Sequence, residues 1–594
     1  MKSAQGPVAR GRLTNRRGLH ATAHPHAAYL LVACLPDNRL DMARPTRRSG
    51  SEPNPVGRIL GYELSGLGSG SNSSKWRTRH DVSFSATSDE AFDLLFGDVS
   101  LDSLVTVSAG LTGVTALDPS GLDAQLAKDG IGRLELNGFL LRRLVTHAIR
   151  RRRSKDWQQG GPVTGRLLVD GLRMQMDLGS KQEQQLSESG PFDPTAMRLL
   201  QAQTHDQVGF QTYHRELALL QLTTELLRRR GIDLEAAYED ALGLNCSELN
   251  MLAVGAFAQI LADPKAPAFD SATWAQGPRG NIFRIAPERV RRFFEATASS
   301  YEEFADRANS PAVNVEGLES YGLSPLIKWP FVRRTDGLLV APVAIDLLER
   351  VTRTFAAESP AFVAARYGVD ARGVLGDVVG GAYEADIRAR LDAIRPGNVH
   401  KLPTDRTTGE RRADLCLLEG GSATLIEIKS HHFGLYSDIR KDRESLLRAL
   451  RPVAEALVQL DDTARAVRRG RLELPGLAGK PSRIVGLIVV RGEQIWLNSN
   501  FVRGIVEELF ALERPSERPI IKYQIANDIG FDSLVDLGVS GASITDFLFE
   551  KCSQTGRNDE YKAEWDLHLA VVPTTVVYSR EAGGRLPMLV CGRA

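Results

Sequence analysis

The sequence predicts an α+β protein of several domains, with a mainly helical N-terminal region followed by an α/β core that carries a mixed sheet. The 594 residues are too many for one hydrophobic core and suggest roughly three or four domains. Apolar residues recur at three- and four-residue steps up to about residue 357, whereas short β-branched strands alternate with helices after Pro360. The composition, 42% hydrophobic and 25% charged, excludes collagen-like, coiled-coil and wholly disordered proteins.

Residues 1–75 form a basic segment unlike the rest of the chain. They contain eleven Lys or Arg and four acidic residues, so they carry +7 while the other 519 residues carry −6, within a total of +1. The segment is rich in Arg, Ser, Gly and Pro, and we expect a disordered leader, with Met42 as an alternative start. The near-neutral total excludes a histone-like basic field but is compatible with a local nucleic-acid site.

Cysteine usage favours a reducing, cytoplasmic compartment. The five cysteines are scattered, with neither CxxC nor Cys/His metal spacing. No apolar run approaches the roughly eighteen residues of a membrane helix, so we expect no membrane partner. The alternative is an exported lipoprotein, because Arg16-Arg17 and a short apolar run at 27–33 precede Cys34.

Residues 76–358 are expected to form one or more mainly helical domains. One helix is expected to close at Arg228-Arg229-Arg230-Gly231, since basic residues and glycine favour helix C-termini. A hairpin is predicted around Thr335-Asp336-Gly337, followed by a helix over 345–355. Another helix ends in a run of four arginines, which indicates either a solvated terminus or a phosphate-binding patch. These arginines are Arg150, Arg151, Arg152 and Arg153.

Residues 359–498 are expected to form an α/β domain, and residues 499–594 a C-terminal α/β extension. The predicted helices are 374–394, 437–467 with a kink or break at Pro452, 501–512 and 543–552. The predicted strands are 412–418, 423–429, 483–490, 494–497, 519–524 and 567–572. This alternation of strands and helices is typical of an α/β domain.

Two apolar strands around Glu419-Gly420-Gly421-Ser422 carry the most informative pattern in the chain. Gly-Gly favours a two-residue hairpin turn, because both turn positions need positive φ. A turn centred on this pair places Asp414 directly opposite Glu427, with Cβ atoms about 4.5–5.5 Å apart. Lys429 shares their face of the hairpin. The opposite, apolar face is expected to comprise Ala413, Leu415, Leu417, Thr424, Ile426 and Ile428.

The two opposed carboxylates repel each other unless a cation lies between them. Carboxylate oxygens suit Mg²⁺ or Mn²⁺, which is usually held by one or two carboxylates together with substrate phosphate. A lysine beside such an ion can orient a water nucleophile and neutralise charge on the phosphate. The pattern therefore predicts hydrolysis of phosphodiester bonds.

Asp414, twelve intervening residues and Glu427-x-Lys429 resemble the motif of the PD-(D/E)xK nuclease superfamily, which includes restriction endonucleases and Holliday-junction-resolving enzymes. The resemblance covers about residues 373–496 and implies a restriction-endonuclease-like core. The chain departs from the motif at Ala413, where many members have proline.

The resemblance also implies roles for two neighbouring helices. The helix before the hairpin would supply a further acid, Glu384, with Asp386 as the substitute, and the helix after it would supply a supporting Gln459. Glu384, Asp414 and Glu427 would then bind Mg²⁺ or Mn²⁺, while Lys429 assists the attacking water. Nucleic acid, with DNA favoured, is the implied partner, and bacterial defence or DNA processing is the implied role.

Basic residues that follow the second strand have two interpretations. The next helix begins with three basic residues, Arg440, Lys441 and Arg443. They either contact a nucleic-acid backbone or lie on a helix face that is exposed to solvent. Of His431 and His432, at most one can face the site, because adjacent residues of an extended chain point in opposite directions.

Two alternatives to a nuclease remain. One is an ordinary hairpin with exposed charges. The spacing of an acid two residues before a lysine is weak evidence by itself, because it also occurs at Asp263-Pro-Lys265 and Glu560-Tyr-Lys562. Only residues 427–429 combine this spacing with an apolar strand, a glycine turn, an opposed Asp and a preceding acidic helix. A catalytically inactive binding or scaffold protein of nuclease-like fold is the other, since a body of charge −6 attracts nucleic acid weakly.

Overall fold

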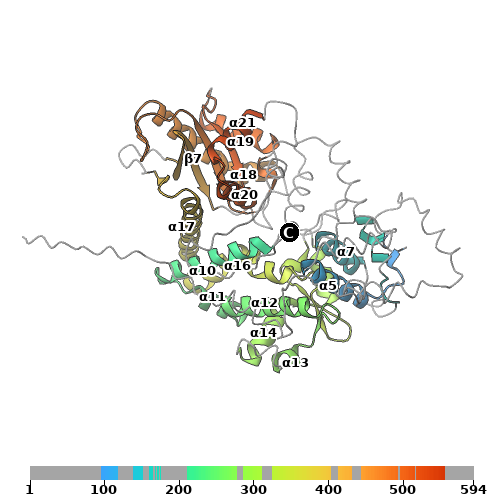
Figure 1. Cartoon of the computed structure of the whole chain (residues 1–594). Coiled ribbons are helices and arrows are strands. Elements are labelled where there is room, and N and C mark those ends of the chain that lie inside the picture. The colour runs from blue at the N-terminus through green and yellow to red at the C-terminus, as the bar shows by residue number, and fades with distance from the viewer. Residues whose placement is uncertain are drawn as a thin grey trace, which may run out of the picture.

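The computed structural model is that of an α+β protein, as predicted, and the structure contains two mixed sheets. It describes residues 92, 95–117, 138–151, 160–164, 167–168, 170–172, 174–175, 210–276, 285–310, 324–402, 412–430, 443–492, 495–498, 500–515 and 517–554. Figure 1 shows a mainly helical part below and a part containing the larger sheet above, with helix α17 (Val369–Ile394) between them. The leader 1–75, with Met42 and Cys34, and the predicted strand 567–572 lie outside the described residues.

The helical part is built from short and medium helices with clear start and stop signals. Asn245 with Glu248, and Ser300 with Glu303, form capping boxes that begin two of them. As predicted, one helix closes at the arginine run that precedes Gly231, where φ is 80°. The helices are α5 (Leu101–Leu117), α7 (Gly138–Arg151), α10 (Phe210–Arg228), α11 (Leu234–Leu242), α12 (Cys246–Ala262), α13 (Ser271–Gln276), α14 (Pro287–Thr297), α15 (Tyr301–Ala308) and α16 (Asp346–Tyr367).

A small sheet of four strands lies within the helical part. Its order is β1-β4-β3-β2, with β2 parallel to β3 and the other pairs antiparallel. The predicted hairpin is confirmed, because β3 and β4 flank a turn in which Gly337 has φ 86°. The strands are β1 (Ala268–Phe269), β2 (Ala298–Ser299), β3 (Phe331–Arg333) and β4 (Leu339–Val340), and the sequence pattern missed the two-residue strands β1 and β2.

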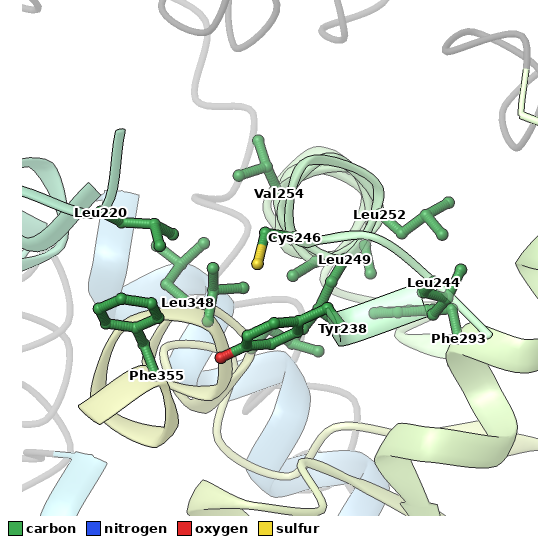
Figure 2. Close-up of a cluster of buried hydrophobic side chains, with 14 of the residues drawn as sticks. Leu220, Tyr238, Leu244, Cys246, Leu249, Leu252, Val254, Phe293, Leu348 and Phe355 are labelled. Carbon is green, nitrogen blue, oxygen red and sulfur yellow. The ribbon is translucent and has the colours of Figure 1, made fainter. Parts of the chain in front are cut away.

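Helix α16 packs against α11 and α12 in a buried apolar cluster, as Figure 2 shows for Phe355 and Leu348 beside Tyr238 and Cys246. The Tyr238 hydroxyl bonds to Ser359 Oγ at 2.8 Å. The helix contains Pro360 and runs through residues 358/359, where the sequence predicts a domain boundary. It continues past the proline because buried apolar residues on both sides of it, including Phe355, belong to one cluster.

The larger sheet has the order β5-β6-β7-β8-β9, antiparallel up to β7 and parallel beyond it. Its strands are β5 (Val399–Lys401), β6 (Leu415–Glu419), β7 (Ser422–Lys429), β8 (Ile484–Val490) and β9 (Lys522–Ala526). The predicted register is confirmed, since Leu415 pairs with Ile426 and Glu419 with Ser422. Gly420 and Gly421 form the turn with φ of 57° and 78°.

Strand β9 pairs with β8, so residues beyond the predicted boundary at 498/499 complete this sheet rather than extend it. The predicted strand 494–497 is also wrong, because 495–498 form a 3₁₀ turn. Asn498 Oδ1 accepts a hydrogen bond from Ile525 N at 3.0 Å, so a side chain of this turn bonds to the backbone of β9.

Helices cover both faces of the larger sheet. Helices α17, α20 (Asp528–Val539) and α21 (Ile544–Gln554) pack on one face, and α18 (Arg443–Arg468) and α19 (Asn500–Glu513) on the other. The predicted alternation is confirmed for Leu415 and Ile426, which face α17. Ala413 departs from it and packs towards α18, because it precedes β6 and its N–H donates to Thr463 Oγ1 at 2.9 Å.

Helix α17 belongs to both parts of the molecule. Its N-terminal half places Leu375 in the cluster of the helical part, and its C-terminal half places Ile387 in the cluster under the sheet. At its end, Arg395 Nε donates to Glu419 Oε1 at 2.6 Å and so holds the helix against the hairpin. The position of α17 along β6 is therefore fixed by the packing of its side chains and by this ion pair.

Within the described part of the chain, no single helix is both long and apolar enough to cross a membrane. Helices α11 and α12 meet the requirement of length and composition only as a pair, which is bent by 67°.

We expect substitution of Gly421 by alanine to destabilise the protein by about 1–2 kcal/mol, because an L-residue is strained at its φ of 78°. Thermal or urea unfolding measures the effect. The matched control is Gly504→Ala in the exposed interior of α19, where open space surrounds the new methyl group and stability should rise by about 1 kcal/mol. Equal effects of the two substitutions would contradict the assignment of the turn.

Candidate active site

Asp414 lies immediately before β6, at the open end of the hairpin. Its Oδ2 accepts a hydrogen bond from the backbone N–H of Ile428 at 2.8 Å. Because Ile428 follows Glu427 directly, this bond holds the Asp414 carboxylate beside Glu427, as the predicted pairing requires. Burial raises the pKa of Asp414, against the opposing effect of the Ile428 N–H, and the charge of Glu384 raises it further.

Glu427 is the most enclosed carboxyl of the hairpin, with 2% of its surface exposed. Its Oε1 accepts a hydrogen bond from Lys429 Nζ at 2.8 Å, while its buried Oε2 has no hydrogen-bond partner among the described residues. Burial, together with the charge of Asp414, raises the pKa of Glu427 to about 7 despite the opposing effects of Lys429 and of the backbone N–H of Asp414. A buried oxygen without a partner is costly, which points to an absent partner at this position.

Helix α18 supports both strands of the hairpin from one face. Lys429 Nζ donates to Gln459 Oε1 at 2.9 Å, so the structure brings together the lysine and the glutamine that the sequence predicts as its support. One turn later, Thr463 Oγ1 accepts the N–H of Ala413 and donates to the carbonyl of Gln459 at 2.7 Å. The ammonium group of Lys429 is therefore held between an acid of its own strand and an amide of α18.

Glu384 projects from α17 towards the edge of the sheet, where it pairs with Lys401 Nζ of β5 at 2.5 Å. Its charge raises the pKa of Asp414. Asp386 instead forms an ion pair with Arg390, with 3.9 Å between Oδ2 and Nη1. Residues two apart on a helix face in different directions, which favours Glu384 over Asp386 as the acid next to the hairpin.

The predicted metal ligands are only partly assembled. Among the residues that the structure describes, no group of three or more His, Cys, Asp or Glu side chains is arranged to hold a metal ion. Two features nevertheless fit a divalent cation. Glu427 Oε2 has no hydrogen-bond partner among the described residues, and the pKa values of two carboxyls are raised by burial and by a nearby acid, which is Glu384 for Asp414 and Asp414 for Glu427. Glu384 would complete the set of metal ligands if its carboxylate released Lys401, whose side chain is 58% exposed, and bound the cation instead.

The predicted nucleic-acid contacts are not brought to the hairpin in the described part of the chain. Arg150 and Arg151 end α7, which lies well apart from β7 (Figure 1), and Arg150 Nε donates to Asn309 Oδ1 at 3.1 Å. Arg443 begins α18, but its side chain is outside the described residues. So are Arg152, Arg153, Arg440, Lys441, His431 and His432, and their roles stay predictions.

Sequence reasoning missed two residues that shape this site. Lys401 lies on β5, which consists of three residues and has no clear sequence signal. Thr463 stands four residues after Gln459 on the buried face of α18, and that i, i+4 spacing is the signal by which it could have been found.

We expect Glu427→Gln to raise the melting temperature of the metal-free protein at pH 8 and to change it less at pH 5. The folded protein holds the Glu427 proton up to about pH 7, whereas an unfolded chain releases it near 4.5, so the stability of the wild type falls as the pH rises through this window. The full difference corresponds to on the order of 3 kcal/mol. Scanning calorimetry against pH measures it.

The control for this pH series is Glu444→Gln, which changes an exposed carboxyl of α18. We expect no pH-dependent gap between this variant and the wild type. If the melting temperatures of Glu427→Gln and the wild type differ by the same amount from pH 5 to 8, burial is contradicted as the origin of the raised pKa of Glu427.

Comparisons of the chain with protein-family models, with curated proteins and with solved structures find no match.

Proposed function

We propose that the chain is a metal-dependent nuclease that hydrolyses phosphodiester bonds of nucleic acid, with DNA favoured, on a restriction-endonuclease-like core. One observation carries the proposal: Asp414, Glu427 and Lys429 converge at the open end of one hairpin, and the buried Oε2 of Glu427 has no hydrogen-bond partner in the described part of the chain. A purely structural hairpin has no reason to bury Glu427 beside a second, half-buried carboxyl, Asp414, at this cost.

The arrangement of neighbouring helices supports the resemblance to PD-(D/E)xK nucleases. The helix before the hairpin carries Glu384, whose charge raises the pKa of Asp414, and the helix after it carries Gln459, which accepts a hydrogen bond from Lys429. Both are the positions that the resemblance implies. Between them stands the strand pair with the predicted register.

The residues present fit Mg²⁺ or Mn²⁺, which Asp414, Glu427 and Glu384 would hold through oxygen atoms. Such an ion lowers the pKa of a bound water and offsets charge on a substrate phosphate. It would also supply the missing partner of Glu427 Oε2 and offset the repulsion between Glu427 and Asp414.

The protein itself provides orientation and proton control. Gln459 and Glu427 together fix the Lys429 ammonium, so that its third donor is free to orient the attacking water or to contact a phosphate oxygen. The Ile428 N–H fixes Asp414, and α18 excludes solvent from one side of the hairpin. A cytoplasmic role in defence or DNA processing belongs to the proposal by family analogy alone.

A second candidate is a binding or scaffold protein that retains the nuclease-like fold without activity. The ion pair between Glu384 and Lys401 favours it, because this pair occupies one predicted ligand with a cation of the protein itself. The acidic body of the chain points in the same direction.

We expect Lys429→Ala to reduce nuclease activity with Mg²⁺ or Mn²⁺ by at least about 100-fold, since it removes the group that orients or deprotonates the attacking water. Single-turnover cleavage of labelled DNA and RNA measures the effect. Lys265→Ala is the matched control, because Asp263-Pro-Lys265 has the same spacing in a loop, and it should leave the rate unchanged. Cleavage that survives Lys429→Ala would contradict the proposed site.

Calorimetry separates the nuclease from the scaffold. We expect the wild type to take up one or two Mn²⁺ ions with release of a proton near pH 7, because the metal displaces the proton held by Glu427. Asp414→Asn should weaken this binding at least about tenfold. Tight binding of nucleic acid or protein without any uptake of metal would favour the scaffold.

A further inference from the structure

A network of buried and partly buried charges lies at the end of the larger sheet, next to the candidate site. We call it the sheet-end network. It consists of Arg215 and Glu216 of α10, Tyr383 and Arg390 of α17, Arg491 and Gly492 after β8, and Asp528 and Asp532 of α20. Its members therefore come from three elements of the sheet part and from one helix, α10, of the helical part.

Arg491 is the centre of the network on the sheet side. It is 2% exposed, and its Nη2 donates to Glu216 Oε2 at 2.7 Å. Glu216 is 7% exposed and lies 275 residues earlier in the chain. Burial lowers the pKa of Arg491, but Glu216, Asp528 and Tyr383 together raise it, and the net change is upward.

Asp528 forms the second half of the network. It is 1% exposed and accepts hydrogen bonds from Tyr383 Oη at 2.5 Å and from the N–H of Gly492 at 2.7 Å. Arg215 of α10 stands beside it, with 3.5 Å between Nη2 and Oδ2, and pairs with Asp532 at 2.6 Å. Helix α10 therefore contributes a cation to α20 and an anion to the end of β8.

The sheet-end network touches two of the candidate site residues through the backbone. The N–H of Arg491 donates to the carbonyl of Lys429 at 2.9 Å, where β7 and β8 end side by side. Tyr383 precedes Glu384 on α17, so the bond from Tyr383 to Asp528 holds the turn of helix that carries Glu384.

We infer that Glu216 is a positioning residue for the candidate site, which acts through Arg491 on the end of β7 and hence on Lys429. This inference rests on the proposed function. It follows that the helical part is required for the geometry of the site, because α10 supplies the only carboxylate shown bonded to Arg491 in the described chain. The docking of α10 thereby couples the helical part to catalysis.

Two observations separate positioning from ordinary stabilisation. A buried ion pair stabilises a fold little more than an apolar pair of the same shape, so stability alone gives no reason for this one. The apolar contact that docks α10 is already present, since Leu219 of α10 is buried in the cluster under the sheet. The charges therefore fix the orientation of Arg491 relative to α10. The hydrogen bond from the Arg491 N–H to the Lys429 carbonyl in turn fixes the backbone of Lys429.

The test compares the full-length wild type with Glu216→Gln and with the double variant Glu216→Leu/Arg491→Met. The double variant removes both buried charges and keeps apolar volume, so it remains folded even if the single variant does not. The matched control is Glu225→Gln on the same helix, where the carboxyl pairs with Arg229 and is 59% exposed.

The first measurement is hydrogen exchange of peptides that cover residues 425–430 and 486–492, which does not depend on activity. We expect exchange at the end of β7 to rise about tenfold or more in both Glu216 variants and to remain unchanged in Glu225→Gln. Unchanged exchange in folded Glu216 variants would overturn the inference. If exchange rises in the Glu216 variants but the wild type has no nuclease activity, only the proposed function is overturned.

The second measurement separates kcat from KM for DNA cleavage. We expect kcat of the double variant to fall by about 10- to 100-fold, with KM within twofold and a melting temperature close to that of the wild type. A kcat that recovers together with the melting temperature would assign Glu216 a purely structural role and overturn the inference.

Discussion

Burial of both faces of the larger sheet is the constraint on which the rest of this structure depends. Every residue of β8 is buried, and β7 is buried up to its last residue. Charged side chains can therefore be accommodated only at strand ends or against dedicated partners. The carboxyls of the hairpin, the lysine that follows them and the sheet-end network all lie where strands of this sheet end.

The two groups of buried charge at this sheet differ in balance. In the sheet-end network each acid faces an arginine, as Glu216 does with Arg491. In the hairpin, Asp414 and Glu427 face each other with Lys429 as their nearest cation, and both have raised pKa values. A balanced network is suited to holding elements in place, whereas an under-compensated pair of carboxyls is suited to receiving a cation.

Much of the fold around the site was predictable because it depends on local signals. The Gly-Gly turn and the apolar alternation specify the hairpin and its register, and Pro396-Gly397 ends α17 where φ of Gly397 becomes positive. The errors occur where long-range packing overrides a local signal. Pro360 resembles a boundary, yet α16 continues through it, and 494–497 resembles a strand, yet its last residues turn to support β9.

For the site, the sequence by itself determined which residues share one end of the hairpin: Asp414, Glu427 and Lys429. These positions follow from strand periodicity and turn geometry, which act over a few residues. Only the tertiary structure decided that Lys401 pairs with Glu384 and that Glu216 reaches Arg491. The two residues of such a pair are far apart in the chain, and no sequence periodicity relates their positions. The pair depends instead on how whole elements pack around a sheet whose two faces must both be buried.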